Sequence, residues 1–156
     1  MSKIDIYTDG SHLDKLNNGR LGCGGVMIIG GIKADEFSEE LKPDWLTTNY
    51  GSSTVSNPTA EMLGLLTALR KFNIPKGVDV VIHADYIGVK SWMEGSWKIK
   101  EPYLKKIKSD IDKEIAKKGL SGRIEFKWVK GHQKASVLDP DARWNNYVDH
   151  LAKGEI

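Results

Sequence analysis

The run Ile4-Asp5-Ile6-Tyr7-Thr8-Asp9-Gly10-Ser11 near the N-terminus constrains the fold most. Isoleucine, tyrosine and threonine favour a buried strand, whereas aspartate, glycine and serine are typical of turns. We therefore expect a strand that ends at Asp9. A carboxylate at the end of a buried strand is costly to desolvate unless hydrogen bonds or a cation meet it, so Asp9 is either a turn cap or a metal ligand.

A second apolar run, residues 77–85, also ends on an acid, Asp85. Its near-continuous valine and isoleucine content is typical of a strand covered on both faces. A helix is predicted between the two runs, and the order strand, helix, strand implies a right-handed crossover. That crossover places Asp85 beside Asp9, at the edge of the sheet where ligands bind.

The intervening helix is predicted to begin at Asn57-Pro58, because asparagine is a good N-cap and proline suits the first helical position. It extends to Phe72 or Asn73. Glu61 lies in the first turn, beside the apolar stripe, and so points toward the body of the protein. As an alternative to a functional role, a first-turn glutamate serves as a capping or helix-dipole partner.

The remaining elements are assigned from pattern. Residues 22–25 contain a glycine-rich run, which lacks the following Gly-Lys-Ser/Thr of a phosphate loop and is interpreted as close backbone approach within a strand. Residues 42–56 read as a long loop, either one wall of a binding site or a surface excursion. We expect strands at residues 22–30, 33–41 and 123–129, and helices at residues 86–94, 101–118 and from about residue 142.

Composition narrows the class of protein. A chain of 156 residues fits one domain, residues 1–156, and its 40% hydrophobic content contains no run long enough to span a membrane. The single cysteine, Cys23, excludes an internal disulfide, and the first residues lack a secretory signal, so we expect a soluble cytoplasmic protein. The net charge of +2 is too small to indicate nucleic-acid binding by itself. Residues 96–118, however, carry eight lysines against four acids. This is either a nucleic-acid contact or a solvated helix face.

Four acids occupy positions that can converge: Asp9, Glu61, Asp85 and, in the last helix, Asp149. Four carboxylates in one cleft repel one another unless divalent cations neutralise them. Oxygen ligands without cysteine or paired histidine favour Mg²⁺, with Mn²⁺ as a possible substitute. The chemistry that matches this set is two-metal phosphoryl transfer.

The order of these motifs resembles type 1 ribonuclease H over nearly the whole chain. The resemblance implies an α/β fold with a five-stranded mixed sheet, three antiparallel then two parallel strands, flanked by helices. It also implies endonucleolytic cleavage of RNA paired with DNA, leaving 5′-phosphate and 3′-hydroxyl ends, with Asp9, Glu61, Asp85 and Asp149 as metal-binding catalytic residues. The motifs are Tyr7-Thr8-Asp9-Gly10-Ser11, Ala60-Glu61-Met62, His83-Ala84-Asp85, Trp128-Val129-Lys130-Gly131-His132 and Asn145-Asn146-Tyr147-Val148-Asp149-His150-Leu151-Ala152.

The resemblance assigns proton transfer to His132, in the loop after the last strand. It places Asn145 beside the metal site. We expect Gly10, Ser11, Asn57 and Asn145 to contact the substrate. Backbone groups of residues 11–13 and the side chain of Asn57 are expected to sense the 2′-hydroxyl in the minor groove of the hybrid.

Two departures from the family affect substrate handling. Asn57-Pro58-Thr59-Ala60 replaces the usual Asn-Asn-Arg run, and Tyr86-Ile87 replaces Ser-Gln.

The hypothesis is therefore a monomeric, Mg²⁺-dependent ribonuclease H whose partner is an RNA/DNA hybrid. Two alternatives stay open. One is another nuclease of the same fold, such as a resolvase or a 3′-to-5′ exonuclease, although the Asp-x-Glu typical of the exonucleases is absent from the first strand. The other is a hybrid-binding module without catalysis.

Overall fold

The computed structural model describes residues 3–12, 20–51, 56–131 and 139–155. The strands are β1 (Lys3–His12), β2 (Leu21–Ile29), β3 (Ile32–Leu41), β4 (Asp79–Ala84) and β5 (Ile124–Trp128). The helices are α1 (Pro43–Tyr50), α2 (Asn57–Lys71), α3 (Ile87–Met93), α4 (Pro102–Lys117) and α5 (Pro140–Lys153).

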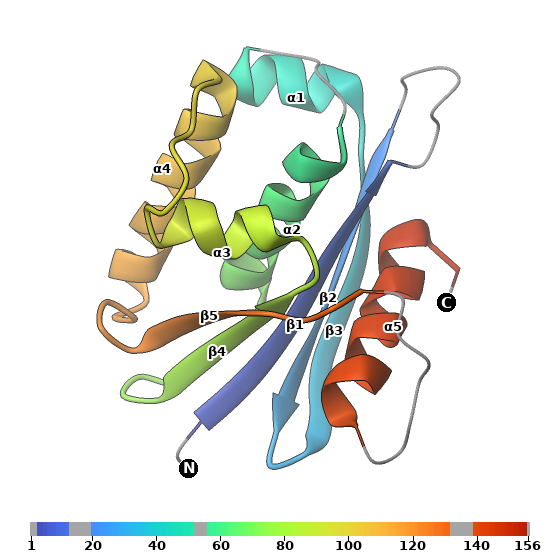
Figure 1. Cartoon of the computed structure of the whole chain (residues 1–156), viewed down its shortest axis with the longest axis vertical. Helices are drawn as coiled ribbons and strands as arrows, with labels where there is room; N and C mark the ends of the chain where they lie inside the picture. The colour runs from blue at the N-terminus through green and yellow to red at the C-terminus, as the bar shows by residue number, and fades with distance from the viewer. Residues whose placement is uncertain (1–2, 13–19, 52–55, 132–138, 156) are drawn as a thin grey trace.

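The strands form one mixed sheet in the order β3-β2-β1-β4-β5 (Figure 1). β1 pairs antiparallel with β2, which pairs antiparallel with β3. On its other side β1 pairs parallel with β4, and β4 with β5. The predicted fold class is thus confirmed, including the crossover through α2 that brings β4 beside β1.

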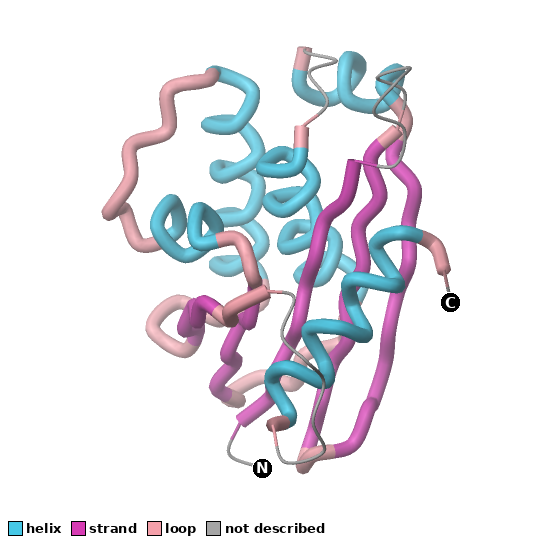
Figure 2. The backbone as a smooth tube through the Cα atoms, turned by 45° about the vertical axis from the view of Figure 1, so that its right-hand side comes forward, coloured by secondary structure: helices cyan, strands magenta, loops and turns pink. Residues whose placement is uncertain are grey.

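Helices cover both faces of this sheet. Helices α1 to α4 lie on one face, whereas α5 crosses the other, over β1, β2 and β3 (Figures 1 and 2). The apolar side chains of α2 and α4 are buried in the larger core, and Trp144, Val148 and Leu151 of α5 form a second cluster with Tyr7 and Val26. Because both faces are covered, most residues of the central strands β1, β2 and β4 are buried.

The prediction that the first strand ends at Asp9 is wrong. β1 continues to His12, pairing Asp9 with Gly24, Gly10 with Cys23 and so on along β2. The parallel pairing with β4 stops one residue before Asp9, at Thr8 and Ala84. At Asp9, β1 therefore no longer pairs with β4 but still pairs with β2. Turn propensity alone does not reveal such a position.

The prediction of a continuous loop over residues 42–56 is also wrong, because α1 occupies part of it. Leu46 and Tyr50 are buried, and the Tyr50 hydroxyl donates to Asp110 on α4. The helix ends in a left-handed Gly51 (φ 70°). Residues 52–55 of this segment lie outside the described residues.

The start of α2 differs from the prediction by one residue. Ser56, not Asn57, is the N-cap, and its hydroxyl accepts a hydrogen bond from the Thr59 backbone N–H at 3.3 Å. Pro58 lies within the first turn as expected. Asn57 is thereby left to make a different contact, described below.

The glycine-rich run of β2 serves close packing, as predicted. A Cβ on Gly24 would lie 2.7 Å from the Leu151 Cβ of α5, and one on Gly25 would lie 2.3 Å from the Phe37 ring. These glycines let α5 and β3 approach the strand.

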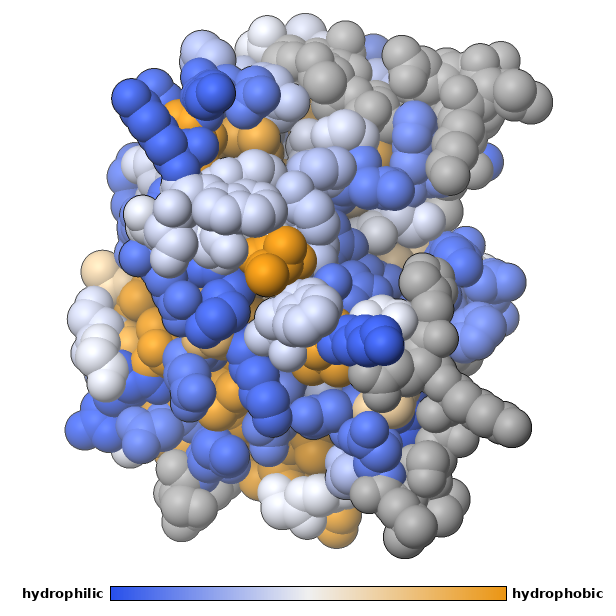
Figure 3. Space-filling model, viewed as in Figure 1, coloured by the Kyte–Doolittle hydropathy of each residue, from blue (hydrophilic) through white to orange (hydrophobic). Residues whose placement is uncertain are grey.

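The outer surface is largely polar. Hydrophilic side chains dominate the face shown in Figure 3, and its apolar patches are small and separated. Within the described ranges, no helix combines the length and apolar character needed to cross a membrane.

Candidate active site

A cleft of about 470 Å³ opens at the end of β1 and β4, bounded by the first turn of α2 and the last turns of α5. All four predicted acids line it. Its described lining residues are Asp9, Gly10, Ser11, His12, Asn57, Glu61, Asp85, Tyr86, Gly131, Asp149 and Lys153.

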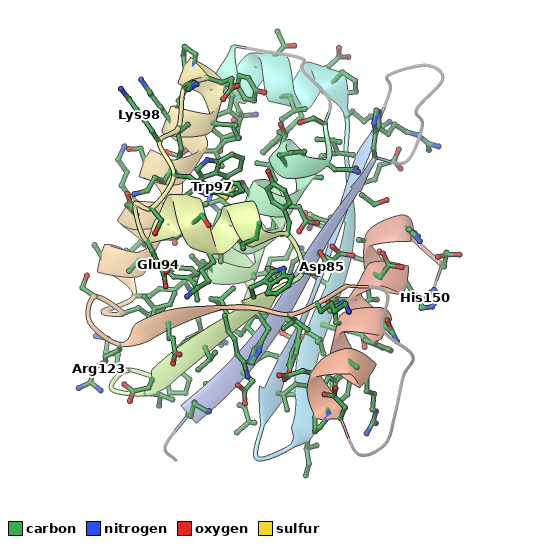
Figure 4. All side chains as sticks on the ribbon, in the orientation of Figure 1. Asp85, Glu94, Trp97, Lys98, Arg123 and His150 are labelled. Atoms are coloured by element: carbon green, nitrogen blue, oxygen red, sulfur yellow. The ribbon has the colours of Figure 1, made fainter. Side chains whose placement is uncertain are left out.

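Asp9, Glu61 and Asp85 form the centre of the cleft. Each offers a carboxylate oxygen, and these oxygens lie within 4.8 Å of one another. Asp9 and Asp85 each follow the last parallel pair of β1 and β4, which explains why two strands place their acids side by side. Figure 4 shows Asp85 where β4 leads into α3.

Glu61 is held by the backbone of β1. The Gly10 N–H donates to Glu61 Oε1 at 2.6 Å, and the Glu61 side chain is only 4% exposed. A Cβ on Gly10 would lie 2.2 Å from the carbonyl carbon of Ala60, so glycine is needed for this approach of α2 to β1. The structure thus gives Gly10 a positioning contact that the sequence did not predict.

Asp85 is held by the end of β5 and by the chain that follows it. The Trp128 indole N–H donates to the Asp85 carbonyl at 3.0 Å. A Cβ on Gly131 would lie 3.0 Å from Asp85 Oδ2, so the chain passes close to this carboxylate. His132 follows directly but lies outside the described residues.

Burial and like charge both act on the central acids. Burial, followed by repulsion from Glu61 and Asp85, raises the pKa of Asp9 well above its usual range. Burial likewise raises the pKa of Glu61, with Asp85 and Asp149 adding to the rise and the Gly10 N–H opposing it. The cluster is therefore unfavourable in its fully ionised form unless a cation accompanies it.

The residues present fit a divalent cation. Glu61 Oε2 is buried and has no hydrogen-bond partner among the described residues, which suits an atom reserved for a metal. The donors are all carboxylate oxygens, the ligands preferred by Mg²⁺ and Mn²⁺. The coarser part of the cofactor prediction is confirmed: the acids form a cluster whose geometry could hold a metal ion.

The comparison with known proteins decides the family. The RNase H family model matches residues 1–156. The chain belongs to the ribonuclease H family. It is 32% identical to the ribonuclease H of Aeromonas hydrophila over 85% of this chain and 80% of that protein. It is 31% identical to that of a Janthinobacterium species over 85% of each chain. The predicted family and enzyme class are therefore confirmed.

A solved structure supports the same fold. LC11-RNase H1 in complex with an RNA/DNA hybrid matches with a TM-score of 0.71 at 22% identity, covering 98% of this chain and 96% of that chain. At this level of identity the likeness concerns the fold.

The predicted substrate contacts separate into two groups. Gly10, Ser11 and Asn57 line the cleft of this ribonuclease H, and Asn57 Oδ1 accepts a hydrogen bond from the His12 backbone N–H at 3.0 Å. Asn145 is 2% exposed and is not among the described residues that line the cleft. Its Oδ1 is buried without a hydrogen-bond partner in the described part of the chain.

Sequence reasoning missed two contributors to the site. Lys153 lines the cleft and forms an ion pair with Asp149, its Nζ 3.0 Å from Oδ2. Gly64 brings α2 close to β1, since a Cβ there would lie 2.9 Å from the Asp9 carbonyl oxygen. The four-residue spacing of Asp149 and Lys153 was an available signal.

Proposed function

We propose that residues 1–156 act as one catalytic domain that hydrolyses the RNA strand of RNA/DNA hybrids in the cleft around Asp9. The observation that carries this proposal is the convergence of Asp9, Glu61 and Asp85 within 4.8 Å in a chain of the ribonuclease H family. The RNA/DNA hybrid in the LC11-RNase H1 complex supports the choice of substrate.

In this proposal Asp9, Glu61, Asp85 and Asp149 hold two divalent cations, Mg²⁺ or, in its place, Mn²⁺. When bound, such ions lower the pKa of an attacking water and stabilise the leaving oxygen, giving 5′-phosphate and 3′-hydroxyl ends. The chain contributes by fixing the acids: Gly10 orients Glu61, and Trp128 holds the backbone of Asp85.

His132 is proposed to accept and pass protons at the edge of this site. Its neighbour Gly131 lines the cleft beside Asp85, which supports the assignment. Asn145, one turn before Asp149 on α5, is proposed to position that end of the site from its buried side chain.

The end of β1 and the start of α2 are proposed to contact the RNA strand. The hydrogen bond from the His12 N–H to Asn57 ties these two segments together. Gly10, Ser11 and the Asn57 amide then present hydrogen-bonding groups along one wall of the cleft, where a 2′-hydroxyl distinguishes RNA from DNA.

The lysine-rich segment is proposed to hold the DNA strand through its phosphates. Trp97 and Lys98 lie on the connection between α3 and α4 (Figure 4), and Trp97 is 43% exposed. The outer face of α4 adds exposed Lys105, Lys106 and Lys113. Such contacts are electrostatic and weaken as salt rises.

A cleavage assay tests the function. A hybrid with labelled RNA is incubated with Mg²⁺, Mn²⁺ or EDTA, beside matched duplex DNA, duplex RNA and single strands. We expect metal-dependent cleavage of the hybrid alone. Preferred cleavage of branched or duplex DNA, or stepwise removal of 3′ nucleotides, would favour another nuclease of this fold, and binding without turnover would favour a silent binding module.

Variants locate the chemistry within the chain. Asp9→Asn and Asp85→Asn are expected to bind the hybrid and to lose at least about 1000-fold in cleavage rate, because each removes a charged metal ligand. Asp79→Asn is the matched control, because Asp79 begins β4, the strand that leads to Asp85. Its side chain is 62% exposed and pairs with Arg123 outside the cleft. Full activity in Asp9→Asn would contradict the metal assignment.

Two finer predictions belong to the same proposal. The protein is proposed to act as a monomer, which light scattering of the purified chain tests. A cytoplasmic location stays a prediction of the sequence.

A further inference from the structure

The cleft contains a cation of its own. Lys153 is the last residue of α5, and its Nζ lies 3.0 Å from Asp149 Oδ2, one turn earlier on the same helix. Of the described residues that line the cleft, Lys153 alone is a lysine or arginine. The pair is partly exposed, with 43% of the Lys153 side chain and 26% of the Asp149 side chain accessible, and it borders the other three carboxylates of the cleft.

Lys153 and a metal ion held at this end of the cleft would share one ligand, the carboxylate of Asp149. Asp9, Glu61 and Asp85 approach one another within 4.8 Å, while Asp149 lies against Asp9 on one side and Lys153 on the other. A lysine ammonium carries a full positive charge at neutral pH. A cation binding at Asp149 must therefore displace this ammonium or share the carboxylate with it.

We propose that Lys153 competes with a divalent cation for Asp149 and thereby sets the metal concentration at which the weaker of two ions binds. The inference rests on the proposed function, because it assumes that the cluster binds divalent ions. The central acids keep one strong site, and the Asp149 side becomes the weaker site because its negative charge is already neutralised.

The competing explanation is that the pair only supports the end of α5. Side-chain pairs four residues apart stabilise helices modestly, and a cation near a helix C-terminus is favourable in itself. On that explanation, removing the lysine charge changes helix stability but leaves metal affinity unchanged. The two explanations therefore differ in a measurement that involves no nucleic acid.

The test is calorimetric titration of the full chain with Mg²⁺ and with Mn²⁺. Lys153→Gln removes the charge, Lys153→Arg keeps it, and Lys90→Gln removes a charge from a pair of the same spacing on α3, 2.8 Å from Glu94. We expect Lys153→Gln to tighten the weaker site by about 1.5-fold to fivefold, the range set by partly exposed ion pairs. Lys153→Arg and Lys90→Gln are expected to match the unchanged chain.

The outcomes separate this inference from the function on which it rests. An unchanged chain that binds no divalent ion would contradict the metal site itself. A chain that binds metal, with Lys153→Gln binding equally or more weakly, would overturn the competition while leaving the proposed function intact. The Mg²⁺ concentration for half-maximal cleavage is expected to fall by the same factor in Lys153→Gln.

Discussion

Replacing Asp9 with asparagine is predicted to stabilise the metal-free protein while it abolishes cleavage. Asp9 is 3% exposed, and burial together with repulsion from Glu61 raises its pKa. Asparagine has nearly the same shape but no charge. The fold therefore loses an unfavourable interaction, and the proposed metal site loses a ligand.

The magnitude follows from the spacing of the acids. Two unit charges 4.8 Å apart repel by roughly 3.5 kcal/mol at an effective dielectric constant of about 20. A carboxyl group can avoid part of this repulsion by binding a proton, so the net cost to the folded protein is smaller than the Coulomb energy. We expect a gain of about 1 to 3 kcal/mol at pH 7, or about 2 to 4 °C in Tm for each kcal/mol.

The pH dependence has a definite sign. Below the unfolded pKa of about 4, Asp9 is neutral in both states and the substitution has little effect. Above it, the unfolded chain releases a proton that the folded protein retains, so the stability of the unchanged protein falls as pH rises toward the raised folded pKa of Asp9. The advantage of Asp9→Asn should thus be small near pH 4 and should increase through neutral pH.

Urea denaturation in EDTA at several pH values between about 4 and 8 measures this difference. Asp79→Asn, at the exposed start of β4, controls for the loss of one carboxylate. Adding Mg²⁺ should stabilise the unchanged protein and not Asp9→Asn, because a ligand stabilises only the state that binds it. An Asp9→Asn protein that is less stable at pH 7, or equally favoured at every pH, would refute the reasoning.

Three further predictions follow from individual contacts. Gly10→Ala should lower the free energy of unfolding, measured by urea denaturation, by about 3 kcal/mol or more, because its Cβ would lie 2.2 Å from the backbone of α2. Gly30→Ala should lower it by only about 1 to 2 kcal/mol, because Gly30 has a φ of 61° but open space around it. Ser56→Ala should lower the free energy of unfolding by about 1 kcal/mol, since the hydroxyl caps α2; an unchanged value would contradict that cap. Lys98→Gln should weaken binding to all hybrid sequences and should reduce the slope of log Kd against log salt concentration by about one, as fluorescence anisotropy would show.

Much of the fold could be predicted because its elements have strong periodicity. The apolar residues of α2 and α4 recur at helical spacing, and the near-continuous apolar run of β4 is typical of a strand covered on both faces. These side chains are buried. The crossover rule then placed β4 beside β1. The end of β1 was not predictable from propensity, because β2 continues to pair with residues that would otherwise form a turn.

Helix α1 was missed because its stability comes from tertiary contacts. The segment Pro43–Tyr50 is rich in threonine, asparagine and aspartate, which favour turns and caps over helix interiors. Leu46 is nevertheless 1% exposed, and the Lys106 ammonium donates to the Asn49 carbonyl at 2.6 Å. A helix of this length is marginal without such packing, so a local sequence pattern carries little information about it.

The acidic residues of the candidate site could be predicted from the sequence, but the distances between them could not. Motif order identified Asp9 and Glu61, yet the distance between them depends on how closely β1 and α2 approach. Two glycines set that approach: a Cβ on Gly10 would lie 2.2 Å from α2 backbone, and one on Gly64 would lie 2.9 Å from the Asp9 carbonyl oxygen. Any larger side chain at either position would separate the strand from the helix. The affinity of the cluster for a cation should therefore depend on these two uncharged residues as well as on the carboxylates.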